Sequence, residues 1–361
     1  MNSSLKFPFY ARASLIFIGL FTLISTLYLA QHIIVPIIYA TIIAIVVSPL
    51  VDFFTRKKMN RSFAIMLSLV LLFLSSALLA AILYSQLSLF TDSFPKLLDK
   101  IYLALNNLVL WVSQNSNIST HKINAFLLNA KTDILSNDSI NATISSVGDA
   151  LVVLILIPVY VFMILFYQPL LRDFIYQLFG EINKQEVGEV LTSSKNVIQR
   201  YLLALLLEAV IIALLNATGF FIIGMDYAIV LGIIGALLNV IPYIGGIISV
   251  VLFMAIAFAT KSSPSYAIWV LVVHVFIQFL DNHYIIPKIV ASKVKINALI
   301  SIVVVLAGGA LWGIPGMFLS IPLTAILKVI FDHIHSLKPW GFLLGDTMPA
   351  LTFFKLPPKN K

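Results

Sequence analysis

The chain contains 361 residues, of which 60% are hydrophobic and 11% are charged. A water-soluble domain carries about 25% charged residues, so this composition excludes an ordinary soluble protein and favours the lipid bilayer as solvent. The chain has no cysteine, which excludes disulfides, thiolate metal sites and a cysteine nucleophile. The formal net charge is +8, but the basic residues gather at the ends of apolar segments. That distribution is typical of membrane topology and not of nucleic-acid binding.

The N-terminal part, residues 1–90, is predicted to hold three membrane spans. A short basic start precedes the first apolar stretch, and no small-residue cleavage site follows it, so we expect an uncleaved span and not a signal peptide. The three stretches run over residues 14–30, 33–51 and 63–90, and the basic loop 56–61 separates the last two.

Residues 91–146 differ in kind, because they are rich in asparagine, serine, aspartate and lysine. Apolar residues recur there at helical spacing, from Phe94 to Trp111 and from Ile123 to Ile134. The pattern predicts a small cap of amphipathic helices outside the membrane.

The remainder, residues 147–361, is predicted to form a transport core. A fourth span, 147–167, leads into the polar amphipathic stretch 168–200, which runs without a break into a fifth span ending near Ile223. Further apolar runs follow at 228–244, 246–260, 266–286, 298–311 and 316–331, and a basic tail covers residues 336–361.

Lysine and arginine counts give the orientation, because short cytoplasmic loops carry an excess of both. With the N-terminus inside, the loop 52–62 and its four basic residues lie inside. The cap at 91–146 then lies outside, and the stretch 168–200 and the tail 336–361 lie inside. We therefore expect a multi-pass protein whose two termini are both cytoplasmic.

Two pairs of apolar runs are short and interrupted. The runs 228–244 and 246–260 contain 17 and 15 residues, at or below the ~17–25 needed to cross the hydrocarbon core. The runs 298–311 and 316–331 are arranged in the same way. The glycines and prolines at the two junctions are Pro242, Gly245 and Gly246, and Gly313, Pro315 and Gly316.

Paired short segments of this kind point to the binding site of a transporter, because non-helical backbone at membrane depth must be buried in protein or line a water-filled cavity. The plainer alternative is that glycine and proline form ordinary loops between full spans. The sequence thus predicts an all-α polytopic membrane protein with about eight membrane segments, in which the two broken pairs are either re-entrant or fully spanning.

One face of the predicted span 266–286 is polar. His274, Gln278, Asp281 and Asn282 fall within about 100° of helical arc. A carboxylate at the centre of a bilayer costs roughly 2.5–3.5 kcal/mol on insertion scales, so this face is predicted to line a substrate or ion pathway. The alternative is that Asp281 anchors the helix end with Lys288 as its partner.

The fifth span carries a second ionisable residue, Glu208, with Asn216 near the same face. Ionisable residues inside spans are functional candidates by default. The alternative is that Glu208 reaches the inner interface or pairs with the cap. Asp332, His333 and His335 are spaced closely enough to suggest a metal site, but such groups are common by chance, and we predict no metal and no cofactor.

Enzymatic motifs are also missing from the sequence. We find no glycine-rich phosphate loop, no serine nucleophile elbow and no HExxH motif. No catalytic residue is therefore predicted, and the missing nucleotide-binding motif argues against ATP-driven transport.

Two stretches resemble a known family. They read GFFIIGMDYAIVLGIIGALLNVIPYIGGIIS from Gly219 and FLDNHYIIPKIVASKVKINALISIVVVLAGGALWGIPGMFLSIPLTAILK from Phe279. Both resemble the autoinducer-2 exporter (AI-2E, or PerM-like) family of bacterial permeases, whose order of spans, cap and broken core this chain shares. Asn239 and Pro287 lie in these stretches and complete the candidate pathway. Ala291, Ala298 and the start of the fifth span depart from the pattern, which leaves the branch of the family open.

The resemblance implies a protein of the bacterial cytoplasmic membrane that acts on a small molecule or an ion. Some members look like exporters of a small furanone signal used in quorum sensing, and others like sodium/proton antiporters. The resemblance also implies a homo-oligomer, of which a pentamer is a candidate form.

Two functions from different classes follow. The first is a secondary transporter of a small polar solute or a monovalent cation, driven by a proton or sodium gradient. The second is a non-transporting membrane scaffold that holds partners through its cap and basic loops. A scaffold has no need of broken helices or a buried polar face, which favours the transporter.

Overall fold

The computed structural model describes residues 8–91, 155–179 and 184–346, apart from residues 243, 262, 264, 292 and 293. Nearly all of the predicted cap and most of the basic tail lie outside these residues. The described part is all-helical, with one isolated bridge between Ile296 and Gly345. Its elements are α1 (Phe9–Leu29), α2 (Gln31–Arg56), α3 (Arg61–Thr91), the helix Ile155–Phe166, α7 (Gln168–Phe179), α8 (Lys184–Ile222), α9 (Ala228–Asn239), α10 (Ile244–Thr260), α11 (Ser265–Leu280), the π-helix η2 (Asp281–Ala291), α13 (Ala298–His333), the 3-10 helix η3 (His335–Leu337) and α14 (Lys338–Leu344).

Six helices of the described part are long and apolar enough to cross a membrane. A seventh span is counted if the helix Ile155–Phe166 and α7, which meet at a 64° bend, form one span. The prediction of an all-α protein with several spans is confirmed. The count of about eight segments stays a prediction, because it requires α9 and α10 to form a membrane segment together.

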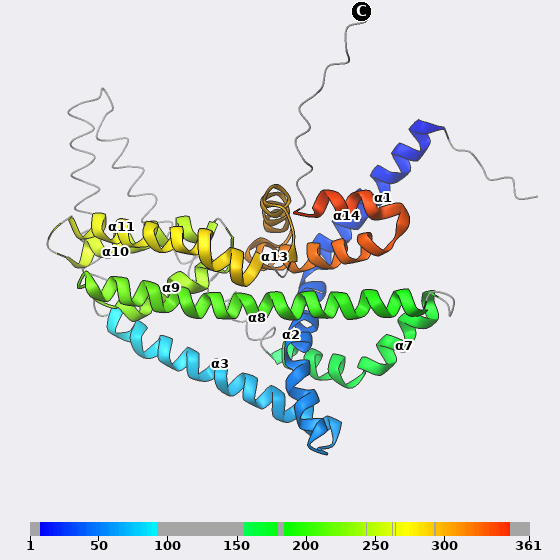
Figure 1. Cartoon of the computed structure of the whole chain (residues 1–361), viewed down its shortest axis with the longest axis horizontal. Coiled ribbons are helices and arrows are strands. Elements are labelled where there is room, and N and C mark those ends of the chain that lie inside the picture. Colours follow the sequence, from blue (N-terminus) through cyan, green and yellow to red (C-terminus); the bar gives the residue numbers. More distant parts are fainter. Residues whose placement is uncertain are drawn as a thin grey trace, which may run out of the picture.

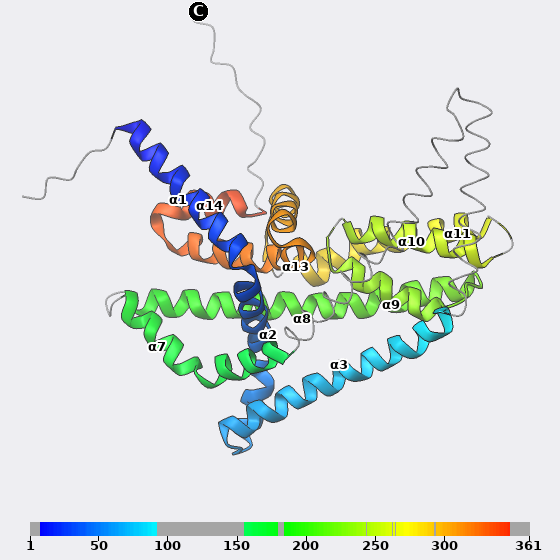
Figure 2. The same ribbon diagram turned by 180° about the vertical axis from the view of Figure 1, so that it is seen from behind.

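The helix α8 runs the length of the molecule and contacts most of the other elements (Figure 1). Its 39 residues extend about 58 Å, well beyond a hydrocarbon core of about 30 Å. The polar first half and the apolar second half form one continuous helix, as the sequence predicts. From behind, α3 rises obliquely towards the α9 end of α8 (Figure 2).

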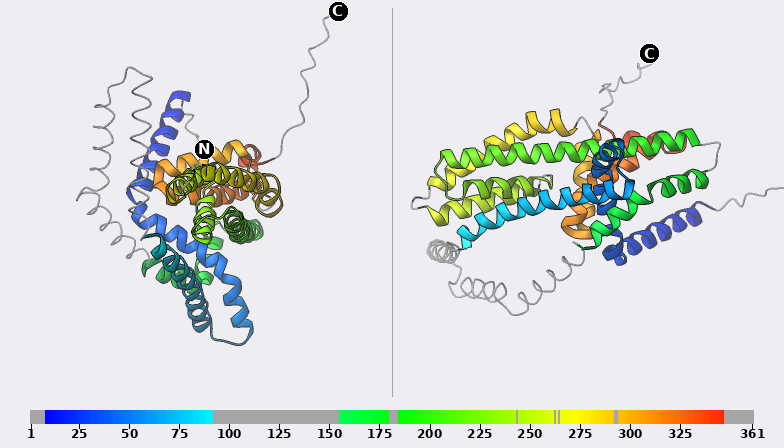
Figure 3. Two further views of the ribbon diagram at one scale, coloured as in Figure 1. Left: turned by 90° about the vertical axis from the view of Figure 1, so that its left-hand side faces the viewer. Right: turned by 90° about the horizontal axis from the view of Figure 1, so that it is seen from below.

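The helices α9 and α10 form an antiparallel hairpin beside α8. They contain 12 and 17 residues, or about 18 and 26 Å. The chain turns back between them, because a Cβ on Gly235 would lie 2.8 Å from the ring of Phe253, a residue 18 positions later. At the turn, the backbone of Gly245 touches that of Leu238 so closely that a Cβ would collide with it. Seen from below, the hairpin runs alongside α8 (Figure 3, right), and α10 also packs directly against α11.

The helix α13 is also folded back on itself. Gly313 has a φ of 65° and a ψ of −145°, which no helix contains. A Cβ on Gly316 would collide with the carbonyl oxygen of Gly308, although residues eight apart in a straight helix are about 12 Å apart. The backbone therefore breaks at both junctions that the sequence marks with glycine and proline. Their placement in a membrane stays a prediction.

The predicted span 266–286 is confirmed as part of the helical segment Ser265–Val290, which is long and apolar enough to cross a membrane, but the type of helix changes midway. The helix α11 ends at Leu280, and the chain continues as the π-helix η2. Proline explains the change, because Pro287 cannot donate a hydrogen bond and its ring clashes with the carbonyl four residues before it. The wider turn of a π-helix relieves that clash, and such turns occur frequently at functional sites.

The predicted tail begins with ordered structure. The short helix α14 packs on α13, and Asn297 fastens the two together. Its side chain accepts from the amide of Ile300 at 2.9 Å and donates to the carbonyl oxygens of Leu343 at 2.7 Å and Gly345 at 3.0 Å. Residues up to Leu344 are thus helical and hold the base of the α13 hairpin. The cytoplasmic placement of the tail 336–361 stays a prediction.

Candidate functional site

Three elements bring polar residues to one level in the core. Glu208 lies 14 residues before the end of α8, and Asn239 lies 11 residues after the start of α9. The two helices are antiparallel neighbours, so both residues lie about 17–21 Å from the shared end. Asp281 follows the last residue of α11, 16 residues after its start, and reaches a similar level.

The amide of Asn239 joins the two carboxylates. Its Nδ2 donates to Oε1 of Glu208 at 3.2 Å and to Oδ2 of Asp281 at 2.9 Å. Nε2 of Gln278 donates to Oδ1 of Asn239 at 3.0 Å, which fixes the orientation of the amide. Gln278 thus positions Asn239, and Asn239 bridges the carboxylates.

Both carboxylates are buried, with Glu208 5% and Asp281 1% exposed. Within the described ranges, the ion pairs closer than 4.0 Å involve other acids: Asp173, Asp226 and Asp332. Asp281 and Lys288 therefore do not form the ion pair that the alternative, a helix-end anchor, requires. Oδ1 of Asp281 is buried without a hydrogen-bond partner there. Because isolated buried charges are expensive, the pair requires a proton or a bound cation to neutralise it.

His274 ties α11 to the start of α10. Its Nε2 lies 3.2 Å from the carbonyl oxygen of Gly246, and a carbonyl oxygen only accepts, so Nε2 carries the proton. The ring packs edge-on against Phe253, with 5.5 Å between centroids. His274 therefore holds the hairpin against α11 one turn before Gln278.

Asn216 lies two turns after Glu208 on α8 and is 1% exposed. Its Nδ2 donates to the carbonyl oxygen of Ile212 at 3.0 Å, and its Oδ1 is buried without a partner in the described part. It lies beside Gly235 of α9. It extends the buried polar groups along α8 but makes no hydrogen bond to the carboxylates in the described part.

The turn of the first hairpin lies next to this polar group. A Cβ on Gly246 would come within 3.2 Å of Nε2 of Gln278, and Gly245 is buried against Leu238. The carbonyl oxygen of Pro242 accepts from the amide of Ile244 at 2.7 Å and closes the turn. The predicted residues Pro242, Gly245 and Gly246 are thus brought to the carboxylates.

Two predicted site residues are not brought to the carboxylates. Asn282 and Pro287 are exposed, and their place in a pathway stays a prediction.

The second junction contacts a different part of the fold. The carbonyl oxygen of Pro315 accepts from the hydroxyl of Tyr39 at 3.3 Å, and Nε1 of Trp312 donates to the carbonyl oxygen of Leu27 at 3.0 Å. Gly313, Pro315 and Gly316 are thus held by α1 and α2 and not by the carboxylates. Among the described residues, Ile244 of the first junction and Trp312 and Met317 of the second pack against the same hydrophobic cluster.

The structure adds Ser249 to the site, a residue that the sequence analysis does not identify as a candidate. It is fully buried, and its Oγ donates to the carbonyl oxygen of Gly245 at 2.7 Å, which stabilises the start of α10. The signal was a single serine four residues after Gly245 in an apolar run. No group of three metal-ligating side chains occurs in the residues that the structure describes.

Comparison with known proteins gives a family and several relatives. The family described as "AI-2E family transporter" matches residues 15–336. The chain is 27% identical over 315 residues to the "Putative transport protein YrrI" of Bacillus subtilis, covering 84% of this chain and 87% of that one. It is 24% identical over 319 residues to the "AI-2 transport protein TqsA" of Escherichia coli, covering 88% and 90%. These matches confirm the resemblance drawn from the two quoted stretches.

Proposed function

Because the chain belongs to the AI-2E transporter family, we propose that it is a secondary transporter of a small polar solute and that Glu208, Asn239 and Asp281 form its coupling site. The observation that carries this proposal is the pair of buried carboxylates joined by one amide and lacking a basic partner in the described residues. A structural role alone gives no reason to bury two like charges at a helix break.

The coupling follows from the hydrogen bonds. A proton on Asp281 turns an acceptor oxygen into a donor, and a cation between the carboxylates competes with the amide of Asn239. Either event changes the bonds that hold the last residue of α9, next to the turn of the hairpin. Binding of a proton or a cation at the carboxylates thereby favours one arrangement of the hairpin over another, as alternating access requires.

The solute that we propose is a small polyhydroxylated signal of the autoinducer-2 type, exported from the cell, with a role in quorum sensing. TqsA, one of the relatives, is named as an AI-2 transport protein. The chain would lie in the bacterial cytoplasmic membrane as a homo-oligomer, with a pentamer as the candidate form, and with both termini inside.

A second candidate is a monovalent cation/proton antiporter. The two carboxylates supply oxygen ligands of the kind that a small hard cation prefers. In this case the same site would bind proton and cation in turn, with no organic solute. Both candidates make the protein a permease and not an enzyme or a scaffold.

Flux into proteoliposomes separates these functions. Solute uptake that depends on an imposed proton or sodium gradient supports the exporter. Gradient-driven sodium flux without solute supports the antiporter. If liposomes that contain the protein show no more flux than empty liposomes under either gradient, the protein does not transport. The scaffold function would then be favoured.

A further inference from the structure

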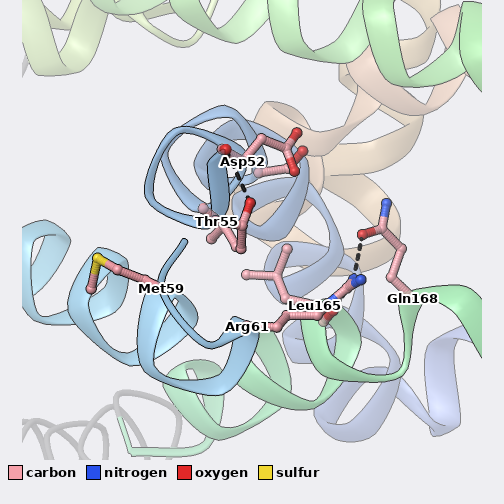
Figure 4. A pocket seen from close by; sticks show the side chains of 8 residues that line it. Asp52, Thr55, Met59, Arg61, Leu165 and Gln168 are labelled. Atoms are coloured by element: carbon pink, nitrogen blue, oxygen red, sulfur yellow. Dashed lines mark hydrogen bonds between the residues drawn. The ribbon is translucent and has the colours of Figure 1, made fainter. Parts of the chain in front are cut away.

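Two adjoining cavities lie away from the carboxylates, between α2, the helix Ile155–Phe166, α7 and α8. Their volumes are about 540 and 320 Å³, within the ~300–1,000 Å³ of small-molecule sites. The two cavities share Ser48, Asp52, Leu165 and Gln168, and we call them together the α7 cavity. Figure 4 shows the smaller one, with Arg61 joined to Gln168 across it.

The lining of the α7 cavity is basic. Arg61 lines the smaller part, Arg172 and Lys195 line the larger part, and Asp52 is the acid that lines both. Nη2 of Arg61 donates to the carbonyl oxygen of Leu165 at 2.8 Å and to Oε1 of Gln168 at 3.0 Å. Nε and Nη1 carry three further N–H donors of the guanidinium. Arg172 also lies 3.9 Å from Asp173, so three cations face two acids, and this positive excess favours an anionic ligand.

A buried hydroxyl faces the same space. Ser48 is 4% exposed and lines both parts of the cavity, and its Oγ has no hydrogen-bond partner among the described residues. A buried polar group without a partner destabilises the fold. A ligand oxygen in the cavity would satisfy it.

The helix α7 places the cavity at the membrane surface. It leaves the helix Ile155–Phe166 at a 64° bend, and Leu170, Phe174 and Leu178 on it are 60–65% exposed. A polar helix that exposes large apolar side chains in this way lies in the plane of the membrane interface. Leu171 and Ile175 line the cavity instead, so its floor is apolar.

We propose that the α7 cavity binds the phosphate headgroup of an anionic phospholipid. The phosphate contacts Arg61, Arg172 and Lys195 and bonds the hydroxyl of Ser48, and the acyl chains cover the apolar floor. Basic pockets between helices at the cytoplasmic surface recognise anionic lipids through this combination. A soluble phosphate compound would leave the apolar floor uncovered. The site is separate from the coupling site, and its role does not depend on the transported solute.

Binding of phosphatidylglycerol and phosphatidylcholine to the purified full chain in detergent, counted by native mass spectrometry, tests the proposal. We expect phosphatidylglycerol to bind and phosphatidylcholine to bind at least tenfold more weakly. Arg172→Gln and Lys195→Gln should each weaken phosphatidylglycerol binding about fivefold. Lys195→Arg should retain it. The matched control is Arg200→Gln, which removes a charge from the same helix at an exposed position outside the cavity.

Ser48→Ala gives a second variant that removes the hydroxyl without adding bulk, and it should also weaken phosphatidylglycerol binding. Equal binding of the two lipids, or equal loss in Arg200→Gln and Lys195→Gln, would overturn the proposal. Competition with glycerol 3-phosphate tests whether the ligand is a lipid or a soluble phosphate compound. If it displaces phosphatidylglycerol completely at millimolar concentration, the occupant is a soluble phosphate compound and the assignment to a lipid is wrong.

Discussion

At the scale of single residues, the core depends on one amide. Asn239 satisfies one oxygen on each of two carboxylates, and Gln278 satisfies Asn239. Glu208 and Asp281 are buried, so their oxygens depend on partners that the fold provides. Loss of the amide of Asn239 therefore leaves buried carboxylate oxygens without a donor.

We predict that Asp281→Asn lowers transport at least tenfold without lowering the amount of protein in the membrane. The substitution keeps the shape but removes the charge that binds a proton or cation, and removal of a charge eases insertion. Flux in proteoliposomes, normalised to protein, measures the effect. Asp226→Asn is the matched control, because Asp226 is exposed and paired with Lys261 at 3.0 Å. If Asp281→Asn transports at the wild-type rate from pH 6 to pH 9, Asp281 only anchors the helix and takes no part in transport.

We predict that Asn239→Leu destabilises the protein by about 1–3 kcal/mol for each carboxylate oxygen that loses its donor. Thermal unfolding in detergent measures this loss. Asn282→Leu makes the same change at an exposed position and should have little effect. If the two variants unfold at the same temperature, the bridge through Asn239 contributes nothing to stability.

At the scale of elements, the two hairpins differ in what they contact. The α9–α10 hairpin places its turn at the carboxylates, and the α13 hairpin places its turn against α1 and α2. Both turns depend on glycine for close approach of two backbones. The base of the α13 hairpin is fastened by α14 through Asn297.

We predict that Gly245→Val and Gly316→Val each abolish transport. A Cβ at Gly245 would collide with Leu238, and one at Gly316 with Gly308, so each turn must open. Since the colliding atoms are backbone, no side-chain rotation relieves the contact. Flux measures the outcome, and size-exclusion chromatography checks that the variants remain assembled.

The control for this pair is Gly19→Val in α1, where a Cβ has nothing within 4 Å. That variant should transport normally. Near-normal flux in Gly245→Val would show that the turn of the first hairpin tolerates opening, and its part in the site would be lost.

At the scale of the whole molecule, α8 connects the two functional regions. Its apolar half carries Glu208, and its polar half lines the α7 cavity with Lys195. Buried Tyr201, Leu202 and Leu205 lie between the two regions and pack with Ile42 and Leu319. A single helix thus joins the proposed lipid site to the proposed coupling site, with a hydrophobic layer separating them.

We predict that cysteines introduced at Asn60 and Asn117 react with an impermeant maleimide from opposite sides of the membrane. Asn60 lies in the basic turn before α3, and Asn117 belongs to the predicted outer cap. The chain has no native cysteine to interfere. In intact cells Asn117→Cys should be labelled, and Asn60→Cys only after lysis. Labelling of both from outside would refute the proposed topology.

The sequence by itself determined that this is a helical membrane protein, where its backbone breaks, and which family it belongs to. These features are local: apolar length, glycine and proline at the junctions, and motif residues read directly from the chain. It also marked Glu208, Asn216, His274, Gln278 and Asp281 as buried polar candidates, because charge and amide groups stand out in apolar runs.

Only the tertiary structure decided which of these residues meet. Asn239 bridges residues 31 and 42 positions away, a pairing that depends on antiparallel packing of α8, α9 and α11 and not on periodicity. The π-helix that follows Asp281 arises where Pro287 removes a helical hydrogen bond. Long-range packing also separates the second junction from the carboxylates and forms the α7 cavity. Local sequence patterns do not reveal contacts of this kind.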